Sequence, residues 1–120
     1  MNLAKIQEIL EKAPAKISFY VENEITEYQS MQTLHEQYRT LRAKKYLEMK
    51  AQGGMTEKER EYTLDVDTEL VDLKNKELIA EINYKGWRNK TNKASDTLQA
   101  TMELARLARK DMLGVDPTIK

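Results

Sequence analysis

Apolar residues recur every three or four positions over most of the chain, a pattern that predicts long amphipathic helices. The first long series runs through Ile17, Val21, Ile25, Tyr28, Met31, Leu34, Tyr38 and Leu41. Its mean step is close to the ~3.5 residues of a coiled-coil seam. We therefore expect one helix from about residue 18 to about residue 51. Gly53 and Gly54 should end it, because glycine readily adopts the left-handed conformation that closes a helix.

A shorter amphipathic segment precedes this helix. Leu3, Ile6 and Leu10 share one helical face, and Asn2 is suited to cap its N-terminus. Pro14 follows, and proline lacks the N–H group that a helix interior needs. The pattern predicts a separate short helix over residues 3–13.

The second half of the chain predicts a short helix followed by a long one. Thr56 and Glu59 have the spacing of a capping box, which indicates a helix from there to about Tyr62. A turn over residues 64–67 follows, and Asp67 is a good N-cap for a last helix from Thr68 to about Leu113. Gly114 should cap that helix and residues 115–120 form a tail. The apolar stripe of the last helix consists of Leu70, Leu73, Ala80, Tyr84, Trp87, Thr91, Ala94, Leu98, Met102, Ala105 and Met112.

These elements predict an all-α fold: a short N-terminal helix plus a long antiparallel helical hairpin, in one domain of residues 1–114. If the hairpin turns over residues 52–67, residue 45 should lie opposite residue 74, and residue 35 opposite residue 84. One Phe and one Trp offer little for a core, so burial between subunits would help. Leu78 and Ile82 widen the apolar face of the last helix. We expect them to form the interface of a homo-oligomer.

Charge is balanced in total, with twenty basic and twenty acidic residues, but it is segregated along the chain. Residues 39–50 are mostly basic, residues 57–72 are acidic, and KGWRNKTNK (residues 85–93) holds four basic residues, no acid and the single Trp. The expected hairpin brings basic residues of both long helices to the same level: Arg39, Arg42, Lys44 and Lys45 beside Lys74, Lys76 and Lys85. Two basic segments would then share one half of the rod, where they would suit DNA phosphates. The candidate DNA-binding residues are Arg39, Arg42, Lys44, Lys45, Lys50, Lys85 and Arg88, with Tyr46 as a candidate for base stacking.

An ordinary structural interpretation stays open beside this one. Charge runs on helices are usually solvated faces, and surface ion pairs contribute little. Trp87 lies on the apolar stripe of the last helix. In this interpretation Trp87 is a core residue and the basic residues around it only solvate the helix.

The chain offers little for catalysis. It has no Cys, His35 is its one histidine, and no lysine of a phosphate-binding loop follows Gly53 and Gly54. We therefore predict no catalytic residue, no metal site, no cofactor and no enzymatic activity. No apolar run approaches the ~20 residues of a membrane span, and the N-terminus lacks a signal-peptide pattern. We expect a cytoplasmic protein without a membrane partner.

Three stretches resemble a known family. They are the opening MNLAKIQEILEK, the basic RTLRAKKYLEMK before the glycine turn, and LDVDTEL at the start of the last helix. Together they resemble the phage recombination mediator family typified by UvsY of the T-even phages. The resemblance implies a non-enzymatic helical protein of the host cell cytoplasm that forms a ring and binds single-stranded DNA. It would help load a recombinase onto DNA covered by single-strand binding protein, and the family's DNA contacts correspond to Arg42, Lys44 and Lys45.

Two other functions are alternatives to this one. A helical phage assembly or protein-interaction factor without nucleic-acid binding needs only the apolar stripes. A DNA-mimicking inhibitor should be strongly acidic, so the neutral charge argues against it.

Overall fold

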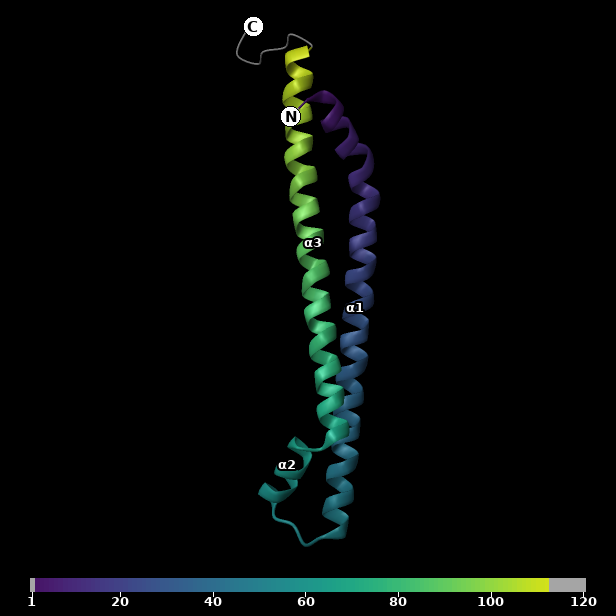
Figure 1. The fold of residues 1–120 in the computed structure, drawn as a ribbon, viewed down its shortest axis with the longest axis vertical. Coiled ribbons are helices and arrows are strands. Elements are labelled where there is room, and N and C mark those ends of the chain that lie inside the picture. The colour runs from purple at the N-terminus through teal and green to yellow at the C-terminus, as the bar shows by residue number, and fades with distance from the viewer. Residues whose placement is uncertain (1, 113–120) are drawn as a thin grey trace. The chain divides into compact units, whose positions relative to one another are not determined.

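The computed structural model describes residues 2–112, which form three helices joined by short connections (Figure 1). The helices are α1 (Leu3–Gln52), α2 (Glu57–Asp65) and α3 (Thr68–Met112). The described part of the chain contains no strand, so the predicted all-α class is confirmed. The expected helix end at Leu113, the cap at Gly114 and the tail of residues 115–120 lie outside the described residues.

The chain divides into two compact units. Unit 1 combines the described residues up to Asn23 with those from Gly86 onward, and unit 2 is Glu24–Lys85. In each unit α1 and α3 lie side by side and antiparallel (Figure 1). Unit 2 also contains α2. The predicted single domain of residues 1–114 stays a prediction.

The expected helix end at Pro14 is wrong, because α1 continues through this residue without interruption. A proline inside a helix costs roughly 3 kcal/mol, since one backbone hydrogen bond is lost and the ring crowds the preceding turn. Apolar side chains on both sides of Pro14 face α3: Ile6 is buried, while Ala13 and Ile17 are half-buried. Burial of this continuous face stabilises the helix across the proline. There is thus no separate N-terminal helix.

The predicted N-caps and the helix end at the two glycines are confirmed, whereas α2 runs to Asp65 and so includes the first half of the turn expected over residues 64–67. The Lys5 N–H donates to Asn2 Oδ1 at 2.8 Å, and the Leu70 N–H donates to Asp67 Oδ1 at 3.0 Å. Thr56 caps α2 and accepts from the Glu59 N–H at 3.2 Å. Gly53 and Gly54 have φ of 72° and 82°, the left-handed region in which a side chain would be strained. At these positions each start or stop has the residue that the backbone needs.

The expected register within unit 2 is wrong by about seven residues. His35 contacts Glu77 rather than residue 84, with 2.7 Å between Nδ1 and Oε1. Lys45 reaches Asp67 rather than residue 74, with 2.7 Å between Nζ and Oδ2. The connection is asymmetric because α2 packs beside the end of α1, where the Tyr46 hydroxyl donates to Glu57. The last turns of α1 therefore face α2 and not α3.

The core is small, as the composition predicted. Among the described residues, the buried apolar ones are Ile6, Leu64, Leu70 and Ala80. Thr101 is 1% exposed, whereas Met102, which we expected on the buried stripe, is 55% exposed. Threonine fits here because it continues the three- and four-residue steps from Leu98 to Ala105.

The predicted interface residues lie on the surface of unit 2. Leu78 is 54% exposed and Ile82 is 61% exposed. Over residues 2–112, none of the helices combines the length and the apolar character needed to cross a lipid bilayer.

Candidate nucleic-acid interface

The two units carry opposite net charge. The described residues of unit 1 include nine Lys and Arg against six Asp and Glu, a net charge of +3. Unit 2 has ten basic residues against thirteen acidic ones, a net charge of −3. The excess of positive charge therefore lies with the N-terminal part of α1 and the C-terminal part of α3, and not where residues 39–50 are.

Unit 1 has a groove lined by lysines from both of its helices. α1 contributes Lys5, Lys12 and Lys16, and α3 contributes Lys90 and Lys93. The groove has a volume of about 500 Å³, and all five lysines are exposed. Among the described residues that line it, Glu8 is the one acid. Positive charge from two chain segments far apart in sequence is thus collected on one surface.

Helical spacing explains why the α1 lysines converge. Lys5, Lys12 and Lys16 are separated by seven and four residues, which places them on one face of a continuous helix. Lys90 and Lys93 are three apart and share a face of α3 in the same way. The sequence carried this signal. We missed it because the predicted break at Pro14 separated Lys5 and Lys12 from Lys16.

Aromatic rings lie beside the groove. Tyr20 is part of its lining, and its ring centroid is 6.0 Å from that of Trp87. Phe19, which is 55% exposed, meets Trp87 edge-on at 5.9 Å. The Lys90 Nζ atom is 4.4 Å from the Trp87 ring centroid, and Lys16 Nζ is 5.9 Å from that of Tyr20. Cation–π attraction holds both ammonium groups near the rings while they remain exposed.

One acid reduces the charge of the groove only locally. Lys12 Nζ lies 3.2 Å from Glu8 Oε1, and this hydrogen bond, with the charges of Lys12 and Lys5, lowers the pKa of the Glu8 carboxyl. Glu8 is therefore ionised at neutral pH and neutralises one lysine. The five lysines and one glutamate leave a net charge of +4 along the groove.

The basic residues predicted in unit 2 meet acids instead of one another. Arg42 lies 3.3 Å from Asp65, and Lys45 lies 2.7 Å from Asp67 and 3.2 Å from Glu69. The hydrogen bond from Lys45 lowers the pKa of Asp67, and the Leu70 N–H adds to the effect. The corrected register causes this arrangement, because it sets residues 42–45 against the acidic segment around α2.

Three further predicted residues of α1 are exposed. Arg39 lies 3.7 Å from Glu36, one turn before it in the same helix. Lys44 and Lys50 are exposed, and Lys44 lines a hollow with Leu41 and Leu73. Their charges do not combine into a surface free of acids, since α2 and the start of α3 lie beside them.

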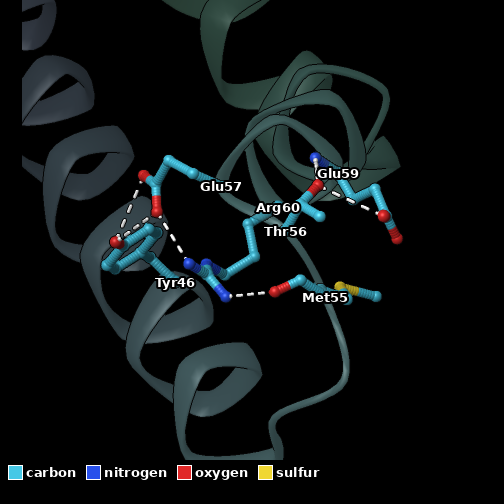
Figure 2. A network of polar contacts seen from close by, with 6 residues as sticks. All are labelled: Tyr46, Met55, Thr56, Glu57, Glu59 and Arg60. Atoms are coloured by element: carbon cyan, nitrogen blue, oxygen red, sulfur yellow. Dashed lines mark hydrogen bonds and ion pairs between the residues drawn. The ribbon is translucent and has the colours of Figure 1, made fainter.

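Tyr46, the predicted stacking residue, holds α2 against α1 (Figure 2). Its hydroxyl donates to both carboxylate oxygens of Glu57, at 3.0 and 3.2 Å. The Arg60 guanidinium lies over its ring, 5.7 Å from the centroid, and also donates to Glu57 at 2.8 Å and to the Met55 carbonyl at 2.7 Å. One face of the ring is therefore occupied within the protein.

The residues of KGWRNKTNK have different environments. Lys85, in unit 2, pairs with Glu81 at 3.1 Å. Arg88, in unit 1, is exposed and is not among the residues lining the groove. Trp87 is half-buried between Phe19 and Tyr20, whereas Lys90 and Lys93 line the groove. The stretch thus supplies both a packing residue and groove lysines.

Within residues 2–112, no cluster of three or more His, Asp or Glu side chains has the arrangement of a metal site. Comparison with known proteins gave no matching family model, no matching curated protein and no matching solved structure.

Proposed function

We propose that this protein binds single-stranded DNA through the lysine groove of unit 1 and acts as a non-enzymatic recombination mediator. The observation that carries the proposal is the convergence of Lys5, Lys12, Lys16, Lys90 and Lys93 beside Tyr20. Exposed ammonium groups bind phosphates by releasing counterions, and an aromatic ring beside them stacks on an unpaired base. A single strand offers both features at once.

The mediator role goes further than the groove and rests on the family resemblance. In this role the protein helps load a recombinase onto DNA covered by single-strand binding protein, in the host cell cytoplasm. We also propose that the protein is a homo-oligomer. Several copies of a groove with modest charge bind one strand far more tightly than a single copy, because each later contact is intramolecular.

The test compares two variants that lose the same number of positive charges. One variant carries Lys16→Ala, Lys90→Ala and Lys93→Ala in the groove, and the other carries Arg42→Ala, Lys44→Ala and Lys45→Ala in unit 2. Fluorescence anisotropy with a labelled oligonucleotide at low salt should show at least about tenfold weaker binding for the groove variant and a smaller loss for the other. Circular dichroism checks that both remain helical.

Two outcomes would contradict the proposed site. A larger loss in the unit 2 variant would place the DNA contacts at residues 39–50. Equal losses in both variants would mean that binding follows total charge and not the groove.

The alternative is a helical phage assembly or protein-interaction factor without nucleic-acid binding. One observation favours it: Arg42 and Lys45, which correspond to the family's DNA contacts, are engaged by Asp65, Asp67 and Glu69. If the wild-type protein fails to bind DNA at low salt, this alternative replaces the mediator.

A further inference from the structure

α3 presents an apolar face on the side of unit 2 that points away from α1. Val71, Leu78, Ile79 and Ile82 are 41–61% exposed. Val71, Asn75, Leu78 and Ile82 are spaced by four, three and four residues, which is the spacing of a coiled-coil seam. The residues of α3 that face α1, including Leu70, Glu77 and Ala80, lie on the opposite side. Helix α3 therefore has a second seam that no part of its own unit covers.

Charged residues border this seam in a pattern that selects a partner. Lys74 and Glu81 are seven residues apart, so they occupy the same position along one edge of the seam. Within the protein Lys74 Nζ is 3.5 Å from Glu77 and 5.0 Å from the ring centroid of Tyr38, and Glu81 is 3.1 Å from Lys85. The Lys74 side chain is 59% exposed and the Glu81 side chain 41% exposed, so each can also meet a charge from outside.

We infer that this seam binds the same seam of a second copy, with the two α3 helices antiparallel. In an antiparallel pair of helices the equivalent edges face each other. When Asn75 of one copy lies opposite Leu78 of the other, Lys74 meets Glu81 of the second copy. The twofold axis repeats this ion pair farther along the same edge, between Glu81 of the first copy and Lys74 of the second. The same register places Val71 opposite Ile82. One antiparallel register therefore matches both the apolar residues and the opposite charges.

A parallel pairing lacks this agreement. The edge with Lys74 and Glu81 would then face the opposite edge, which carries Asp72, Ile79 and Gly86. In register, Lys74 would lie opposite Ile79 and Glu81 opposite Gly86. Neither Lys74 nor Glu81 then meets an opposite charge. Apolar contacts alone would stabilise a parallel pair. The charge pattern thus indicates an antiparallel dimer as the unit of the self-association proposed above, on which this inference rests.

A charge exchange tests the register. Lys74→Glu alone and Glu81→Lys alone each turn two attractive pairs into repulsive ones, and each should weaken the dimer about tenfold. The double variant restores both pairs and should recover dimerisation. Sedimentation velocity over a range of protein concentrations gives the dissociation constants, and circular dichroism confirms that each variant is helical.

A matched pair of leucine variants tests the seam itself. Leu78→Lys should leave a monomer, whereas Leu104→Lys, at an exposed leucine of α3 in unit 1, should dimerise like the wild type. A monomeric wild type at high concentration, or single variants that dimerise like the wild type, would overturn the inference. DNA binding by the monomeric Leu78→Lys variant would show that the groove functions even if the oligomer proposal fails.

Discussion

At the scale of single residues, two of the five groove lysines are held near aromatic rings, while Lys12 pairs with Glu8. Lys90 lies over Trp87, and Lys16 lies over Tyr20. A cation–π contact keeps an ammonium group in place without neutralising it. Arg42 and Lys45 show the opposite case, because acids engage them directly. The two basic regions therefore differ in what their side chains contact. Lys16 and Lys90 contact aromatic rings, whereas Arg42 and Lys45 contact carboxylates.

Gly86 provides a residue-scale prediction. It lies inside α3, and a Cβ atom added there would meet nothing within 4 Å. Gly86→Ala should therefore raise the free energy of unfolding by about 0.5–1 kcal/mol, because alanine loses less backbone entropy in a helix.

Urea denaturation followed by circular dichroism measures this change. The control is the reverse substitution at another exposed position of α3, Ala100→Gly. It should lower the free energy of unfolding by a similar amount. A loss of stability in Gly86→Ala would mean that another chain packs against this position.

At the scale of elements, the sequence predicted the caps and the antiparallel pairing of the two long helices, but not the continuity of α1 or the register of the pair. Caps at Asn2, Thr56 and Asp67 are local devices, so a few neighbouring residues are enough to predict them. The continuity of α1 through Pro14 depends on burial against α3, which local pattern does not contain. The register depends on where α2 packs, and that is a tertiary property as well.

These two errors explain why the lysine groove of unit 1 was not predicted from the sequence. The break at Pro14 hid the α1 lysines, and the register error placed the basic residues of α1 beside Lys74 and Lys76 instead of the acidic segment. The structure therefore has its excess of positive charge in unit 1, whereas the predicted helices placed it in unit 2. In KGWRNKTNK the sequence pointed to Lys85 and Arg88, whereas the residues that line the groove are Lys90 and Lys93.

The junction of α2 and α3 provides an element-scale prediction. In the folded protein the pKa of Asp67 lies below its ordinary value of 3.8, chiefly because Lys45 donates to it. The stability that this carboxylate contributes is present above its unfolded pKa and is lost as the pH falls through the lower, folded pKa. The Leu70 amide proton reports this titration, since it donates to Asp67.

Nuclear magnetic resonance can follow the Leu70 amide shift as the pH falls. The midpoint should lie below 3.8, and Lys45→Ala should move it upward. A wild-type midpoint at or above 3.8 would show that Lys45 does not hold Asp67 in solution.

At the scale of the whole molecule, a neutral chain carries two units of opposite charge. The net charge is +3 in the described residues of unit 1 and −3 in unit 2. A polyanion is attracted to the first and repelled by the second. The neutral total charge therefore does not argue against DNA binding, because a bound strand would interact mainly with the local positive charge of the groove.

The most direct test of the groove is the salt dependence of binding to a single-stranded oligonucleotide. For single strands the logarithm of the binding constant falls with the logarithm of salt concentration by about 0.7 for each phosphate contact. Four lysines not neutralised by Glu8 predict a slope of about −3 for one copy of the wild-type protein. The variant without Lys16, Lys90 and Lys93 should have a slope closer to zero by about 2. An unchanged slope in that variant, or wild-type binding that does not respond to salt, would contradict the groove as the DNA-binding site.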